Sequence, residues 1–155
     1  MTDIIRVSAA NLAKIPLDDK LLVALNKSRL KKGKMVYTPF GGAIEFEPEA
    51  RAFLNGLEAE FEKGNDLRFT MPEENIAAFE NWFMRAQDRE LNPYRELREE
   101  LVEEEQVLDK LGRNDLVTAY LGTAKERAET DRPGQEGQVT QRFLEVFDVE
   151  FQPEY

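Results

Sequence analysis

Six consecutive residues, Arg95-Glu-Leu-Arg-Glu-Glu100, have the types and the spacing that chemistry requires. On a helix, Glu96, Glu99 and Glu100 stand at i, i+3 and i+4, so that three carboxylates share one face. Carboxylates at this spacing repel one another by roughly 0.2–0.5 kcal/mol per pair, which a solvated surface tolerates. Clustered carboxylate oxygens also hold hard divalent cations such as Mg²⁺. The segment therefore predicts either a metal site or a solvated acidic helix face.

The residue types elsewhere in the chain restrict the chemistry further. The sequence contains no Cys and no His. Thiolate zinc sites, cysteine nucleophiles and His-dependent triads are therefore excluded. A metal would need oxygen ligands, which favours Mg²⁺, Mn²⁺ or Ca²⁺. Acid–base catalysis would depend on carboxylates, Tyr or Lys.

The net charge is −10 over 155 residues, a length that suits a single buried core. Duplex nucleic acid and anionic membranes attract a basic surface, so neither is an expected partner. A phosphorylated small molecule remains compatible, because a bound metal reverses the local field. The chain starts without a basic and then apolar leader, and it has no long apolar run. We expect a soluble, cytoplasmic protein.

The six residues need a helix to position them. Asn92 and Pro93 form a good N-cap and first-turn pair, and Gly112 ends the pattern. Within the predicted helix the apolar face comprises Tyr94, Leu97, Leu101 and Leu108, and the acidic face comprises Glu96, Glu99, Glu100 and Glu103.

Strands are predicted on both sides of the helical part of the chain. Upstream, apolar runs predict strands at 3–7, 20–26, 35–38 and 43–46, although periodicity does not exclude a helix at 20–26. Pro39 is expected to stop the third of these strands, and Gly41-Gly42 to form a turn. Downstream, strands are predicted at 116–121 and 139–151, with a polar loop at 129–138.

Two further helices are predicted between the glycine pair and the acidic helix. The first has the stripe Phe53, Leu54, Leu57 and Phe61 and ends at Gly64. The second starts at Pro72 and has the stripe Ile76, Phe79, Trp82 and Phe83. A short strand is expected between them at 66–70. Strands before and after helices indicate a mixed α/β domain with helices on both sheet faces.

The combination of Tyr37-Thr-Pro-Phe-Gly-Gly-Ala-Ile-Glu45 with Arg95-Glu-Leu-Arg-Glu-Glu100 resembles the signature of the Nudix hydrolase family. That signature starts with Gly-Gly-x-x-Glu after a strand and ends with Arg-Glu-(aliphatic)-x-Glu-Glu on a helix. The resemblance implies one Nudix-like α/β/α sandwich with a mixed sheet over residues 1–155. The two halves lie much further apart here than in the family, so 47–88 is interpreted as a helical insertion. Glu47 and Glu90 compete for the interior glutamate of the signature.

The resemblance also implies a chemistry. Gly41, Glu96, Glu99 and Glu100 would hold Mg²⁺ or Mn²⁺, Glu96 or Glu100 would take the proton of the attacking water, and Arg95 would orient a neighbouring carboxylate. The reaction would be hydrolysis of the pyrophosphate bond in a nucleoside-diphosphate-linked substrate. The alternatives are a noncatalytic Nudix-like module for nucleotide sensing or protein interaction, and an acidic interaction protein with an accidental resemblance.

Several other residues have a functional and a structural interpretation. Additional metal ligands are sought among Glu103, Glu126, Glu129 and Asp131, each of which is more simply a solvated acid. Phe79, Trp82 and Phe83 are expected in the core rather than stacked on a base, and Tyr37 and Phe40 are expected to be structural. Exposed aromatic residues of the insertion would offer a homodimer surface. The basic stretch 27–34 is expected to be a solvated turn.

Overall fold

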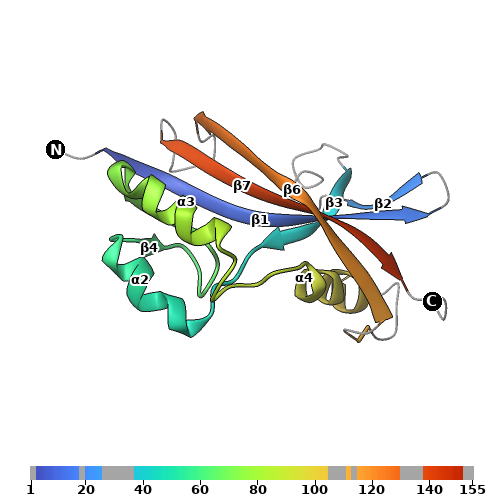
Figure 1. Ribbon diagram of the computed structural model, residues 1–155. Helices are drawn as coiled ribbons and strands as arrows, with labels where there is room; N and C mark the ends of the chain where they lie inside the picture. Colours follow the sequence, from blue (N-terminus) through green and yellow to red (C-terminus); the bar gives the residue numbers. More distant parts are fainter. Residues whose placement is uncertain are drawn as a thin grey trace. The chain divides into compact units, whose positions relative to one another are not determined.

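The computed structural model describes residues 3–17, 20–25, 37–104, 111–112, 115–129 and 138–151. The chain divides into two compact units. Unit 1 comprises Met1–Ala10, Ala43–Leu91 and Thr123–Leu144, and unit 2 comprises Asn11–Gly42, Asn92–Gly122 and Glu145–Tyr155. Three strands contribute residues to both units, namely β1 (Ile4–Leu17), β6 (Leu116–Glu129) and β7 (Val139–Phe151), and β7 pairs with β1 and with β6 (Figure 1).

Unit 1 combines short antiparallel strands with two helices. Strand β5 (Arg68–Pro72) pairs with the start of β1 from Ile4↔Pro72 to Ser8↔Arg68, and β4 (Glu60–Phe61) pairs with the other side of β5. Helix α2 (Arg51–Gly56) follows the short helix η1 (Pro48–Ala50). Helix α3 (Ile76–Met84) follows η2 (Glu73–Asn75).

The core of unit 1 is aromatic. Phe79 of α3 is fully buried, and its ring centroid lies 5.3 Å from that of Phe69 and 5.5 Å from that of Phe143. Trp82 and Phe83 lie on the same face of α3 at i+3 and i+4, and both are buried. Full burial of such side chains contributes about 1.5–3 kcal/mol each. The predicted core role of these three residues is confirmed, so they offer no exposed aromatic surface for a dimer.

Unit 2 contains the strands and the helix that carry the two halves of the signature. Strand β2 (Lys20–Leu25) pairs antiparallel with the end of β1 and with β3 (Tyr37–Ala43). Helix α4 (Tyr94–Arg98) continues into a π-helix, η3 (Glu99–Glu104). The core of this unit is a cluster of buried apolar residues: Ala13, Ile15, Leu97, Leu101, Leu111, Leu116, Phe147 and Val149.

The predicted α/β class with a mixed sheet is confirmed, and the described residues contain three α-helices. The strand over 139–151 is confirmed, and 20–25 is a strand rather than a helix. β1 and β6 are longer than predicted. No helix among the described residues has the length and apolar character needed to cross a membrane.

Two elements differ from the prediction. The strand that was expected to stop at Pro39 continues through the glycine pair, and Pro39 itself pairs with Val23. The helix that was expected to reach Phe61 ends at Gly56, and Phe61 lies in β4. Strand pairing decides both cases, since Pro39 pairs with Val23 of β2 and Phe61 pairs with Phe69 of β5. The Phe61 ring packs against Phe46 and Phe69 (centroids 4.9 and 5.5 Å apart) instead of extending a helical stripe.

The two ends of the segment that was interpreted as an insertion are joined by backbone hydrogen bonds in unit 1. The Glu47 amide donates to the Asp88 carbonyl (2.8 Å), and the Glu90 amide donates to the Glu45 carbonyl (2.9 Å). The segment contributes β4 and β5 as well as helices, so it is not purely helical. Its bounds at 47–88 stay a prediction, as does the single domain over 1–155.

Candidate functional site

Helix α4 starts at Tyr94, one residue later than the predicted N-cap at Asn92 implies. The Asn92 side-chain oxygen accepts a hydrogen bond from the Tyr94 amide (3.0 Å), and Pro93 is the N-cap residue. The Tyr94 hydroxyl donates to the Leu111 carbonyl (2.7 Å), while Leu97 is completely buried in the core of unit 2. These contacts fix the start and the rotation of the helix that carries the acidic residues.

The helix changes geometry within the signature. Regular α-helix ends at Arg98, and Glu99–Glu104 form the π-helix η3. Such segments are rare and frequently lie at functional sites. Leu101 remains buried, whereas Glu99 and Glu100 are half-buried.

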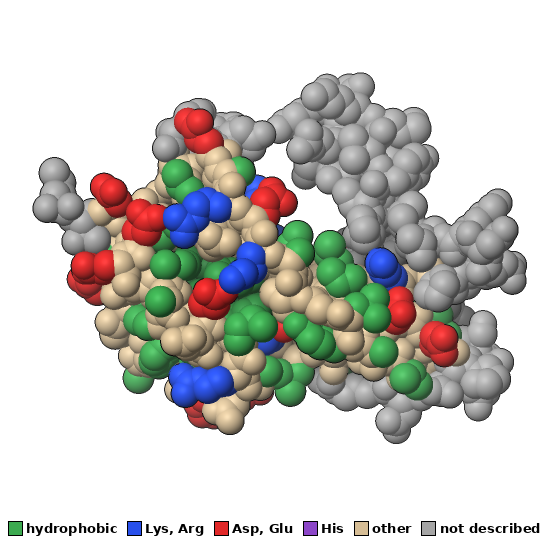
Figure 2. All heavy atoms as spheres, turned by 45° about the horizontal axis from the view of Figure 1, so that its top comes forward, with side chains coloured by type: hydrophobic (Ala, Val, Ile, Leu, Met, Phe, Trp, Pro, Cys, Tyr) green, Lys and Arg blue, Asp and Glu red, His purple; other side chains and the backbone are tan. Residues whose placement is uncertain are grey.

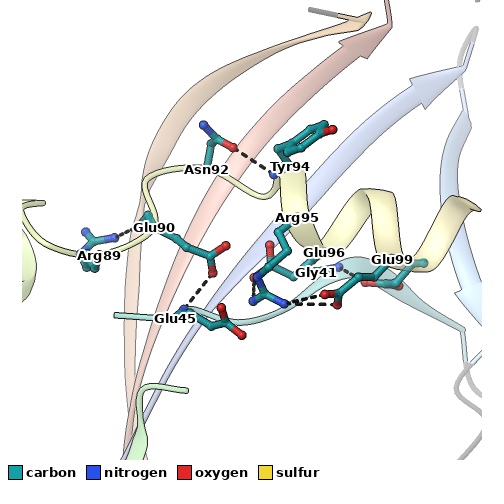
Figure 3. Close-up of polar contacts among 10 residues, drawn as sticks. Gly41, Glu45, Arg89, Glu90, Asn92, Tyr94, Arg95, Glu96 and Glu99 are labelled. Carbon is teal, nitrogen blue, oxygen red and sulfur yellow. Dashed lines mark hydrogen bonds and ion pairs between the residues drawn. The ribbon is translucent and has the colours of Figure 1, made fainter. Parts of the chain in front are cut away.

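Arg95 binds two of the three carboxylates. Its Nη2 donates to Glu96 Oε1 (2.9 Å), and its Nη1 donates to both oxygens of Glu99 (3.1 and 3.2 Å), as Figure 3 shows. The Glu96 side chain is only 4% exposed, against 26% for Arg95 and 39% for Glu99. A carboxylate this deeply buried needs a charged partner to offset its desolvation, and Arg95 supplies that partner.

The third carboxylate contacts the glycine pair. Glu100 Oε1 accepts a hydrogen bond from the Gly41 amide (2.9 Å). A Cβ atom at Gly42 would lie 3.2 Å from Glu96 Cγ, and one at Gly41 would lie 2.0 Å from the Asn11 carbonyl oxygen. Gly41 also has a φ of +149°, which L residues rarely adopt. The glycine pair therefore allows close approach of β3 to α4 on one side and to β1 on the other.

The structure brings together five of the predicted site residues in unit 2, and we call them the motif cluster: Gly41, Arg95, Glu96, Glu99 and Glu100. Glu47 and Glu90, the two candidates for the interior glutamate of the Nudix-like signature, differ in their surroundings. Glu47 is exposed, whereas Glu90 Oε1 accepts a hydrogen bond from the Glu45 amide (2.8 Å) in unit 1.

The predicted additional ligands do not join this cluster among the described residues. Glu126 and Glu129 are exposed on the part of β6 that belongs to unit 1. The side chains of Glu103, Tyr37 and Phe40 lie outside the described residues, as do Leu108, Asp131 and the basic stretch 27–34.

The motif cluster fits a hard divalent cation in the chemistry of its donors but not in their arrangement. All candidate ligands are oxygens, as Mg²⁺ and Mn²⁺ prefer. However, the Arg95 guanidinium occupies both oxygens of Glu99 and Oε1 of Glu96, and the Gly41 amide occupies one oxygen of Glu100. The second Glu96 oxygen, Oε2, is buried and is bound by neither donor. Over the described part of the chain, no three acidic side chains come together closely enough to hold a metal ion.

One buried polar residue beside the glycine pair was not predicted. Asn11 of β1 is 1% exposed, and its side-chain oxygen has no hydrogen-bond partner among the described residues. By the alternation of β1, its side chain points to the same face as Ala13 and Ile15, which pack in the cluster that contains Leu97. The signal in the sequence is a polar residue within a regular apolar alternation that starts at Ile5.

No curated protein and no solved structure matches this chain. One family model does match, over residues 4–155, and it is described as the SMODS-associated NUDIX domain. The match includes both halves of the signature and nearly all of the sequence. The chain therefore belongs to the SMODS-associated NUDIX domain family.

Proposed function

We propose that this Nudix domain recognises a nucleoside-diphosphate-linked ligand without hydrolysing it. One observation carries the noncatalytic part, namely that each of the three motif carboxylates already accepts hydrogen bonds from a donor in its own chain. In this role the motif cluster joins helix α4 to strand β3. Membership of the Nudix family supports the choice of this ligand class.

The positive charge of Arg95 opposes metal binding at the motif cluster. A divalent cation that bound Glu96 and Glu99 would have to displace the guanidinium or lie beside it, and two cations at one site repel each other. Breaking a buried ion pair by removing one partner costs about 3–5 kcal/mol, and less where one partner is partly exposed as Arg95 is. Metal binding at this site therefore starts with an unfavourable free-energy term.

A hydrolase is the second candidate, and a specific observation favours it. The two halves of the signature are distant in sequence, yet Gly42 lies so close to the buried Glu96 side chain that a Cβ atom there would be 3.2 Å from Glu96 Cγ. In that case Gly41, Glu96, Glu99 and Glu100 would be the metal ligands, with Glu96 or Glu100 as proton acceptor and Arg95 as the orienting residue. Mg²⁺ or Mn²⁺ would then supply charge neutralisation at the phosphates.

Metal and ligand titrations separate the two candidates. Calorimetric titration of the whole chain with Mn²⁺ is expected to show no saturable binding. Dinucleotides and nucleotide sugars are then tested for a rise in Tm, and their products are followed by phosphorus NMR in the presence of Mg²⁺. A rise in Tm without product supports recognition alone.

Other outcomes are equally informative. Saturable Mn²⁺ binding together with product formation would establish the hydrolase. If neither metal nor any nucleotide-derived ligand changes the Tm, the proposed ligand class is wrong. The family description names an association with SMODS, so a SMODS protein is the partner to test in that case.

A further inference from the structure

Unit 1 contains a cavity of about 360 Å³ that is separate from the motif cluster. Its walls come from α3, β6 and β7, and its lining residues are Ile76, Glu80, Lys125, Arg127, Gln141 and Phe143. None of them belongs to the Nudix signature, and the composition of the sequence does not indicate a site here. The cavity therefore requires its own interpretation.

The floor of the cavity is apolar and firmly held. Phe143 is 1% exposed, and its ring packs against Phe79 and Phe83 with centroids 5.5 and 5.4 Å apart. Ile76, at the start of α3, is partly buried and packs against the same core. Because the Phe143 ring is almost wholly covered, an apolar group in this cavity would contact chiefly Ile76, which packs on the same aromatic core.

A buried amide orients one of the two cations at the rim. Gln141 is 9% exposed, and its side-chain oxygen accepts a hydrogen bond from Arg127 Nε (2.9 Å). The Gln141 amide group in turn donates to the Glu126 carbonyl (3.3 Å). Lys125 stands two residues before Arg127 on β6, so both side chains lie on the same face of the strand. Two positive charges thus converge on one cavity of a chain whose net charge is −10.

Both cations form ion pairs that an incoming anion can replace at low cost. Lys125 Nζ lies 2.6 Å from Glu80 Oε1, and Arg127 Nη1 lies 2.6 Å from Glu73 Oε1. All four side chains are between 33% and 57% exposed. Pairs as exposed as these contribute about 0–1 kcal/mol each. On the face drawn in Figure 2, Lys and Arg side chains likewise lie among acidic and hydrophobic ones.

We propose that this cavity binds a small organic anion. Its apolar part lies against Ile76, above the core that contains Phe143, and its phosphate or carboxylate replaces the Glu80 and Glu73 carboxylates at Lys125 and Arg127. The volume is within the usual range for small-molecule sites, about 300–1,000 Å³. An oriented guanidinium is also suited to bidentate binding of such a group. The proposal does not depend on the function of the motif cluster, because the two share no residue.

Three probes test the two-part recognition: phenyl phosphate, phenol and inorganic phosphate. In calorimetric titrations of the whole chain at low ionic strength, phenyl phosphate is expected to bind at least tenfold more tightly than either fragment. The affinity is expected to fall as salt is added, because exposed charges are screened. Equal affinities for phenyl phosphate and inorganic phosphate would remove the role of the apolar floor and overturn the proposal.

Substitutions of the cavity cations and of a competing carboxylate are expected to change the affinity in opposite directions, which tests whether the anion replaces the carboxylates. Lys125→Gln and Arg127→Gln are expected to weaken phenyl phosphate binding at least tenfold, whereas Glu80→Gln is expected to tighten it severalfold by removing the competing carboxylate. Lys14→Gln and Glu58→Gln are the matched controls, since both are exposed charges outside the cavity. If these controls change the affinity as much as the cavity variants, binding follows net charge alone and the proposal fails.

Discussion

Arg95 is the residue on which the interpretation of the motif cluster depends. In Arg95→Gln, the buried Glu96 loses its ion pair, so the free energy of unfolding is expected to fall by about 1–3 kcal/mol. Because Glu96 and Glu99 are then released from the guanidinium, Mn²⁺ is expected to raise the Tm of the variant and not that of the wild type. Urea and thermal unfolding with and without Mn²⁺ measure both effects.

The neighbouring Arg98→Gln is the control for this change, since it removes the same charge from the same helix. It is expected to show no response to Mn²⁺. A Mn²⁺ response in the wild type that is lost in Arg95→Gln would contradict the expectation. Arg95 would then orient metal ligands, and the hydrolase would become the better candidate.

Gly41 tests the close approach of β3 and β1. An alanine side chain there meets the Asn11 carbonyl oxygen and also needs a φ of +149°, so Gly41→Ala is expected to lower the free energy of unfolding by about 3 kcal/mol or more. Gly56→Ala is the control, because a Cβ atom there has nothing within 4 Å. It is expected to be neutral or to stabilise α2 by about 0.5–1 kcal/mol. Equal urea midpoints for the two variants would show that the approach is not tight.

At the residue scale, the sequence predicts which side chains form the motif cluster but not how they pair. The spacing of Arg95 and Glu99 at i, i+4 allows their ion pair. The burial of Glu96, however, depends on Gly42, which is distant in sequence and packs on its side chain. Asn11 is visible only as a polar interruption in an apolar alternation, because its burial depends on residues that are not its neighbours in sequence.

Among the elements, two backbone hydrogen bonds form a short ladder that closes the segment between Glu47 and Asp88: Glu47 to Asp88, and Glu90 to Glu45. By joining the two ends of this segment, the ladder shortens the path along the chain between the two halves of the signature. Arg89 stabilises it from inside. Its side chain is buried, donates to the Phe83 and Glu90 carbonyls, and lies with its guanidinium 4.0 Å from the centroid of the Phe83 ring.

Removal of this guanidinium should open the ladder. In Arg89→Met, hydrogen exchange of the Glu47 and Glu90 amides is expected to accelerate, because carbonyls that the guanidinium held are left unsatisfied. The Leu97 amide, which donates within α4 of unit 2, reports the change in global stability, and the acceleration at Glu47 and Glu90 is expected to exceed it. Exposed Arg85→Met is the control variant. Unchanged exchange at Glu47 and Glu90 would show that the ladder closes without Arg89.

Element types were predictable where the pattern is local. The strand over 139–151 and helix α3 follow from periods of two and of about four residues. The bounds of β3 and α2 were not predictable, because strand pairing places Pro39 opposite Val23 and Phe61 opposite Phe69, and neither pairing shows in the local pattern. The π-helix η3 has no sequence signal that we recognise.

For the whole molecule, the arrangement of the chain in two cores raises the question of cooperativity. The core residues of unit 1 and those of unit 2 form separate clusters. Yet β1, β6 and β7 each contribute residues to both units without a break. When such a strand loses its pairing in one unit, the part of the same strand in the other unit is also weakened. We therefore expect the chain to unfold in one transition.

A core substitution in each unit tests this expectation. Phe79→Ala in unit 1 and Leu101→Ala in unit 2 are each expected to lower the free energy of unfolding, by about 3–5 and about 2–5 kcal/mol respectively. If unfolding is cooperative, Phe79→Ala lowers hydrogen-exchange protection of the Leu97 amide in unit 2 as much as that of the Ala9 amide in unit 1. Two thermal transitions, with Phe79→Ala shifting only one, would instead make the units separate domains. The prediction of a single domain over residues 1–155 would then be wrong, and the motif cluster would have to be tested in unit 2 by itself.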